Sequence, residues 1–230
     1  MLDQAFDALK TYDWGTDPKV LQPIDEAIVS THADAAARKD LEARLIAVLK
    51  ADVSRAAKDA VCRALKTVGT AASVPALAAL LPDEKLSHMA RYALERIPEP
   101  EAGQALREAL PKVDAKLKVG MISSLDVRGE ATSVAPLQAL LADSDPAVSG
   151  AAAKALGVID SAPAHQALAT AKPSPATKAA IAESLLGIAQ KQLLAGKKQE
   201  AKATYDRILA STPSKAVKSA ATFGVQACAK

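Results

Sequence analysis

The chain has 230 residues, of which 50% are hydrophobic, 3% are aromatic and about a quarter are alanine. Alanine is the best helix former and lets helices approach closely. The composition therefore predicts an all-α protein whose core consists of many close helix–helix contacts between small side chains. A formal net charge of +3 indicates no class of partner. No apolar run reaches the length of a membrane span, and the spacing of Cys62 and Cys228 argues against a disulfide framework or a metal knuckle.

The N-terminus is not typical of a signal peptide, because "MLDQAFDALK" lacks a basic start and an apolar middle. We therefore expect a soluble chain, which is cytoplasmic as written. If an export signal was removed before Met1, the chain would instead be exported or periplasmic.

Two helices are predicted next, over 17–30 and 32–52. Asp17 before Pro18 gives the first an N-cap residue followed by proline at the first helical position. The segment before them holds Tyr12 and Trp14, the only tryptophan. A terminal repeat has one face without a neighbour, so we expect these two rings to cover that end, with a binding role for Trp14 as the alternative.

From residue 54 onward the sequence repeats itself. The phrase "SVPALAALL" at 73–81 returns as "SVAPLQALL" at 133–141. Two interleaved leucine series have spacings of 29 to 31 residues, which is within the range of helical solenoids. The second-helix series is Leu77, Leu106, Leu137 and Leu168, and the first-helix series is Leu65, Leu94, Leu125, Leu156 and Leu186. We call the members of both series anchor leucines.

Each repeat is predicted to be a helix, a short break and a second helix. Gly69, Gly129 and Asp160 mark breaks, and the glycines suit left-handed C-terminal caps. Asp145-Pro146 and Ser174-Pro175 mark helix starts. Neither helix of such a pair could bury its apolar stripe alone, so neighbouring pairs are expected to stack.

The segment from Ser54 to Pro173 resembles HEAT repeats, specifically the short phycobilisome-lyase type and repeats of uncharacterised bacterial proteins. The resemblance is carried by "VPALAALL", "VAPLQALL" and "AAAKALGVI". It implies a right-handed α-solenoid, an armadillo-like superhelix, of about five helix pairs.

The C-terminal segment resembles one tetratricopeptide unit. Gly196 stands at the turn, Ala201, Tyr205 and Ile208 lie on the second helix, and Pro213 closes it, whereas Leu185 stands where the family has an aromatic residue. The predicted organisation is a cap and first helix pair over 1–53, HEAT-like repeats over 54–176, and a tetratricopeptide-like pair with a capping helix over 177–230.

The second helices should turn one face away from the packing stripe, at positions −2, +1, +2 and +5 from each anchor leucine. The HEAT resemblance implies that these faces line the concave groove. The residues expected to contact a partner there are Gln104, Arg107, Glu108, Gln138 and Gln166.

Basic residues are concentrated at the C-terminus. Residues 177–230 hold nine Lys or Arg and three Asp or Glu, a net charge of +6, whereas residues 1–176 hold 20 and 23, a net charge of −3. This segment is either a solvated module or a docking surface for an acidic partner. The lysines that would form such a surface are Lys197, Lys198, Lys202, Lys215 and Lys218.

The sequence holds no motif typical of catalysis. His32, His88 and His165 stand apart from one another, no His-Glu pair of the HEAT-type metal hydroxylases occurs, and no glycine-rich phosphate loop is present. We therefore expect no enzyme, no cofactor and no metal. Nucleic-acid binding is disfavoured, because the inferred groove has one arginine and no aromatic ring.

The function expected from the sequence is a non-catalytic scaffold or adaptor that binds another protein through a helix or an extended segment. Two alternatives remain open. One is an enzyme-associated module similar to lyase-type HEAT proteins, and the other is a weak nucleic-acid binder that uses the basic C-terminal segment.

Overall fold

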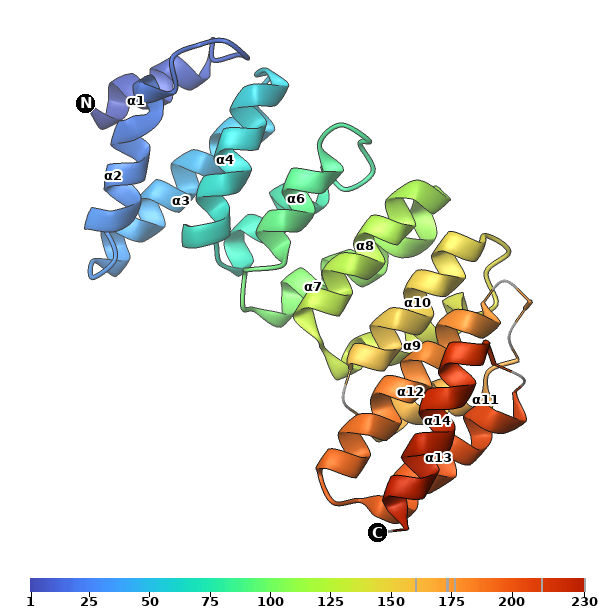
Figure 1. Cartoon of the computed structure of the whole chain (residues 1–230). Coiled ribbons are helices and arrows are strands. Elements are labelled where there is room, and N and C mark those ends of the chain that lie inside the picture. The colour runs from blue at the N-terminus through green and yellow to red at the C-terminus, as the bar shows by residue number, and fades with distance from the viewer. Residues whose placement is uncertain (160, 173, 176, 212, 230) are drawn as a thin grey trace. The chain divides into compact units, whose positions relative to one another are not determined.

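The computed structural model describes residues 1–159, 161–172, 174–175, 177–211 and 213–229. Every regular element in these ranges is a helix, as the composition predicts (Figure 1). The chain forms two compact units, residues 1–124 and 125–230. The boundaries predicted at 53/54 and 176/177 rest on repeat type and remain predictions, and Ala176 lies outside the described residues.

The first unit begins with α1 (Leu2–Leu9), which packs against η1 (Pro18–Leu21) and α2 (Gln22–Ser30). The helix α3 (Ala35–Lys50) follows, so both helices predicted upstream of the repeats are present. Asp17 caps η1 as expected, because its carboxylate accepts a hydrogen bond from the Lys19 N–H at 3.0 Å. Trp14 is 62% exposed, so the prediction that its ring covers the end was wrong, and α1 buries Phe6 and Leu9 instead.

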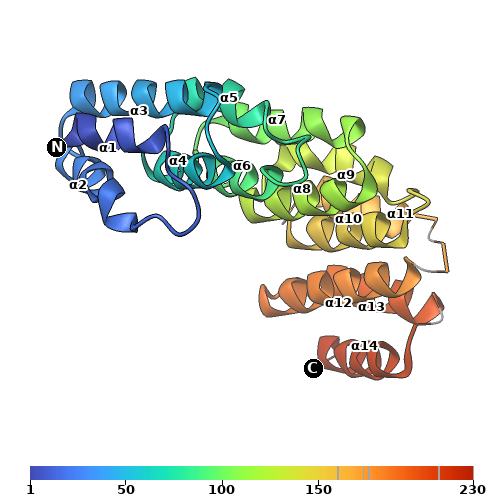
Figure 2. The same cartoon turned by 90° about the horizontal axis from the view of Figure 1, so that it is seen from above.

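Two layers of helices follow within residues 1–124. The helix α4 (Arg55–Val68) packs beside α6 (Ser87–Leu94), while α3, α5 (Val74–Ala78) and α7 (Pro100–Ala109) pack side by side (Figure 2). The short helices η2 (Ala71–Ser73) and η3 (Leu110–Lys112) precede α5 and follow α7. The predicted anchor leucines form the core of these contacts, each at 0% exposure: Leu65, Leu77, Leu94 and Leu106.

A buried carboxylate fixes α3 to the start of the next second helix. Glu42 accepts hydrogen bonds from the Thr70 N–H at 2.7 Å, the Thr70 hydroxyl at 3.0 Å and the Ser73 hydroxyl at 2.5 Å. A buried charge is tolerated when it is hydrogen-bonded in this way. The contact therefore sets where one repeat joins the next.

The two glycine breaks differ in backbone conformation. Gly129 has φ +62°, so it forms the predicted left-handed cap. Gly69 has φ −64° and ψ 145°, so the left-handed cap predicted there was wrong. Glycine is favoured at that position because a larger residue would clash: a Cβ would lie 2.4 Å from the Leu65 carbonyl oxygen and 3.0 Å from Ile97 Cδ1. The third predicted break, Asp160, lies outside the described residues.

The helix α8 (Ala115–Arg128) contains the boundary between the units. In the second unit, η4 (Ala131–Ser133) leads into α9 (Val134–Leu140), followed by α10 (Pro146–Val158) and α11 (Ala162–Thr170). The helix α9 packs beside α11, and α10 packs against both. Asp145 caps α10 as predicted, accepting from the Ala147 N–H at 2.7 Å. This order of contacts is compatible with stacked helix pairs.

The last three helices, α12 (Lys178–Leu194), α13 (Lys198–Ala210) and α14 (Lys215–Cys228), pack on one another, and α12 also packs on α10. Because α12 begins at Lys178, the start predicted at Pro175 was early. The leucine register also shifts by one: Leu185 is buried at 5% exposure, whereas the predicted Leu186 is half-buried. Three residues of the tetratricopeptide resemblance are in the core: Ala201, Tyr205 and Ile208.

Candidate interaction surfaces and an apolar cleft

The positions predicted to face away from the packing stripe do so. None of those in the described part of the chain is buried, because the helical period turns them away from the anchor leucines. Pro173 belongs to the same set and lies outside the described residues. The others are Pro75, Ala78, Ala79, Pro82, Gln104, Arg107, Glu108, Pro111, Ala135, Gln138, Ala139, Ala142, Gln166, Ala169 and Thr170.

In the first unit the predicted partner residues lie on α7. Gln104 and Glu108 are exposed, and the Gln104 side-chain amide donates a hydrogen bond to Glu108 Oε1 at 2.7 Å. Arg107 is half-buried beside them. This face of α7 therefore carries one cation, one anion and one amide, so charged groups of either sign on a partner could find an opposite charge there.

In the second unit the predicted residues are Gln138 on α9 and Gln166 on α11, and both are exposed. Their helices pack beside each other, so the two amides lie on neighbouring elements. The five predicted residues thus form two groups, one in each unit.

The five predicted basic residues are exposed on α13 and α14 or just before α13. Two have acidic neighbours: Lys197 Nζ lies 3.8 Å from Glu200 Oε2, and Lys202 Nζ lies 2.7 Å from Asp206 Oδ2. Exposed pairs of this kind contribute little stability, but they partly neutralise the local charge. The remaining three are Lys198, Lys215 and Lys218.

Sequence reasoning missed a cleft of about 500 Å³ in the first unit. It lies between α2 and α4, with Leu9 of α1 and Leu45 of α3 also in its lining. The period of α2 indicates which residues face α4, but the space depends on how far apart the two helices lie. No sequence signal gave that distance.

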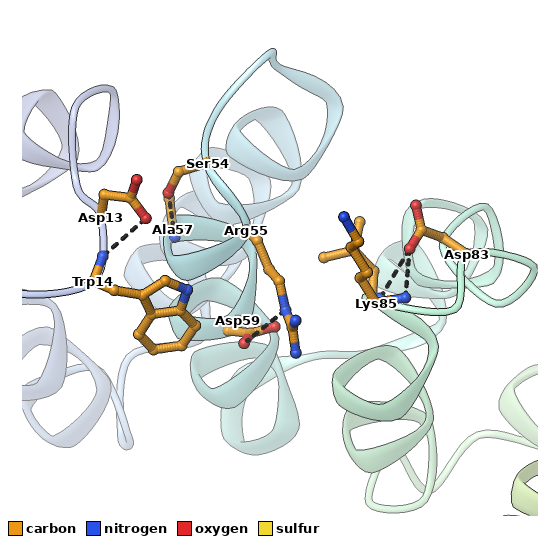
Figure 3. A network of polar contacts seen from close by, with 9 residues as sticks. Asp13, Trp14, Ser54, Arg55, Ala57, Asp59, Asp83 and Lys85 are labelled. Atoms are coloured by element: carbon orange, nitrogen blue, oxygen red, sulfur yellow. Dashed lines mark hydrogen bonds and ion pairs between the residues drawn. The ribbon is translucent and has the colours of Figure 1, made fainter.

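The loop that carries Trp14 is fixed to the start of α4. The Ser54 hydroxyl donates to the Tyr12 carbonyl oxygen, and it accepts from the Ala57 N–H at 3.0 Å (Figure 3). The backbone N–H of Trp14 donates a hydrogen bond to Asp13 Oδ1 at 2.8 Å. The tryptophan ring is therefore presented to solvent from an anchored loop, and the alternative binding role for Trp14 remains a prediction.

One turn further along α4, Asp59 is buried at 4% exposure. Its nearest cation is Arg55, whose Nε lies 3.9 Å from Oδ2, while Oδ1 has no hydrogen-bond partner (Figure 3). Burial raises the pKa of Asp59, and the charges of Arg55, Arg63 and His88 offset this in part. Burial therefore favours the protonated form of this carboxyl group more than water does.

Among the residues that the structure describes, no three His, Cys, Asp or Glu side chains are grouped so that they could hold a metal ion. No helix in the described part of the chain is both long and apolar enough to cross a membrane.

Comparison with known proteins gives matches to solved structures alone. No protein-family model and no curated protein matches the sequence. One engineered protein of the Northeast Structural Genomics Consortium is 20% identical over 98% of this chain and 67% of its own, with a TM-score of 0.47. A second is 20% identical over 90% of this chain and 96% of its own, with a TM-score of 0.41.

The human deoxyhypusine hydroxylase, solved in complex with glycerol, is 16% identical over 99% of this chain and 96% of its own, with a TM-score of 0.39. At these TM-scores, no property of the three proteins is carried over to this chain.

Proposed function

We propose that the protein is a non-catalytic scaffold or adaptor that binds another protein through the outward faces of its second helices. The observation that carries the proposal is the exposure of these faces on α5, α7, α9 and α11. Alanine, proline and glutamine dominate them, so a helix or an extended segment can approach closely and hydrogen-bond to the amides.

We also propose an architecture in which these outward faces form one continuous surface. The helix pairs are expected to continue across α8 as one right-handed α-solenoid similar to HEAT repeats, closed by the tetratricopeptide-like helices. Small-angle X-ray scattering tests this. A compact globule of this length has a radius of gyration of about 17 Å, and a solenoid must exceed that value clearly. A radius at the globular value would contradict the solenoid.

Binding is tested by quantitative capture from a native lysate. The double variant Arg107→Glu/Glu108→Lys inverts the two charges on the outward face of α7, and we expect it to lose the proteins that the wild type enriches. The matched control is Asp7→Lys/Lys10→Glu, which inverts an exposed pair at the C-terminal end of α1, where Lys10 Nζ lies 2.7 Å from Asp7 Oδ1. Capture unchanged in the α7 variant would refute this use of the α7 face.

A further inference from the structure

The cleft of the first unit has an apolar floor. Leu9, Leu45 and Val61 close its base and are themselves buried, at 1%, 0% and 1% exposure, so the surface that a ligand can reach lies on the walls. The wall on α4 includes Ala60 and Ala64, whose small side chains leave room that a larger residue would fill. A volume of about 500 Å³ is typical of sites for small molecules.

The opposite wall is one face of α2 and the preceding turn. Leu21, Ile24 and Ile28 follow one another at intervals of three and four residues, as on one side of a helix. This run spans roughly 10 Å at 1.5 Å per residue. Val29 extends the apolar surface to the rim, where it is 76% exposed. The cleft is therefore long enough for an aliphatic chain.

Charged groups are unevenly distributed around the cleft. Arg63 and Lys66 line the α4 side, and Asp25 lines the α2 side. Arg63 is exposed and makes no ion pair with a described residue. Lys66 is held in place, since its Nζ donates to the Tyr92 hydroxyl at 2.9 Å and lies 4.5 Å from the centre of that ring. The lining thus carries a net charge of +1 beside an apolar floor.

We propose that this cleft binds a small amphiphilic monoanion, with an aliphatic chain along the α2 wall and a carboxylate on Arg63. A guanidinium presents two parallel N–H donors that match a carboxylate, so Arg63 selects the head group. The apolar chain gains free energy by leaving water for a surface that water hydrates poorly. A cationic head group would meet Arg63 and Lys66 and is disfavoured.

The test is isothermal titration calorimetry of the full chain with decanoate, below the concentration at which decanoate aggregates. Decanol and decyltrimethylammonium have the same chain with an uncharged or a cationic head. Decanoate is expected to bind about tenfold more tightly than decanol, which corresponds to one charge-assisted hydrogen-bonded contact. The cationic compound should bind most weakly.

Three substitutions locate the site. Arg63→Glu should weaken decanoate binding by about tenfold or more and leave decanol binding unchanged. Ala60→Leu should weaken the binding of both compounds, because the larger side chain occupies the cleft. Asp25→Asn should tighten decanoate binding, because it removes the carboxylate. Arg96→Glu, an exposed arginine on the segment after α6 and outside the lining, is the matched control and should change nothing.

Thermal unfolding of each variant establishes that it folds. Decanoate that does not bind at millimolar concentration would overturn the proposal. So would Ala60→Leu binding decanoate with wild-type affinity, because the ligand would then lie elsewhere. If Arg63→Glu and Asp25→Asn both bind like the wild type, carboxylate recognition is refuted.

Discussion

Two titratable groups are buried on the same helix. Asp59 and Cys62 lie three residues apart on α4, and burial raises the pKa of both, that of Cys62 to about 12. Burial disfavours the charged form of each group. The pH dependence of stability, for Asp59, and the rate of thiol labelling, for Cys62, therefore report on the packing of α4 in solution.

The pH dependence of stability should reveal Asp59. Its pKa is raised in the folded state, so the folded chain holds the proton more tightly than the unfolded chain. The free energy of unfolding then falls as the pH rises from about 3.8 through the folded-state pKa. Asp59→Asn removes this cost and should be more stable than the wild type at pH 7, with the difference vanishing below the unfolded-state pKa.

Urea unfolding at several pH values measures this difference. The exposed Asp52→Asn is the matched control and should follow the wild type. An Asp59→Asn protein that is less stable than the wild type at neutral pH would show that the carboxylate is favourably paired in solution.

The two thiols should differ in reactivity. Cys62 is 1% exposed and Cys228 is half-buried. The thiolate is the reactive form, and burial both shields Cys62 and keeps its thiol protonated, so at pH 8 a maleimide should modify Cys228 much faster than Cys62. Mass spectrometry of the labelled peptides gives both rates, which should converge in denaturant. Equal rates in the native protein would contradict the burial of Cys62.

At the scale of the element, sequence periodicity identified the leucines around which the repeats pack. The anchor leucines from Leu65 to Leu168 were predicted from spacing alone, because each repeat must bury the same face against its neighbour. The register failed at Leu186, where "SLLG" offers two adjacent leucines and spacing does not choose between them. The cleft could not be predicted, because the distance between α2 and α4 is a tertiary property.

Truncation of an anchor leucine should be costly. Leu125→Ala and Leu137→Ala each remove a side chain at 0% exposure, and each should lower the free energy of unfolding by roughly 2–5 kcal/mol. Chemical unfolding measures the loss, and Gln138→Ala, the exposed neighbour of Leu137, should lie within about 0.5 kcal/mol of the wild type. Losses below about half a kcal/mol at both leucines would contradict the repeat register.

The shifted register on α12 has its own test. Leu185 is buried and Leu186 is half-buried, so Leu185→Ala should destabilise the chain more than Leu186→Ala, by about 1 kcal/mol or more. The two variants change the same residue type at adjacent positions of one helix, so each is the control for the other. If Leu186→Ala were instead the less stable variant, Leu186 would be the anchor leucine, as its spacing of 30 residues from Leu156 had predicted.

At the scale of the whole molecule, the chain has two compact units, 1–124 and 125–230, and charge is unevenly distributed along it. The candidate partner residues were predicted from helix geometry; four of the five are exposed, and Arg107 is half-buried. Their use by a partner stays a prediction, because exposure follows from the helical period while affinity depends on the partner. The proposed function requires that one partner contacts residues of both groups.

The most direct measurement is therefore quantitative capture from a native lysate with variants in each unit. Arg107→Glu/Glu108→Lys alters α7, Gln138→Glu/Gln166→Glu alters α9 and α11, and Asp7→Lys/Lys10→Glu alters α1 as the control. We expect the same proteins to be lost from the first two variants and kept by the third. If the first two variants retain every protein that the wild type captures, the second-helix faces are not the binding surface.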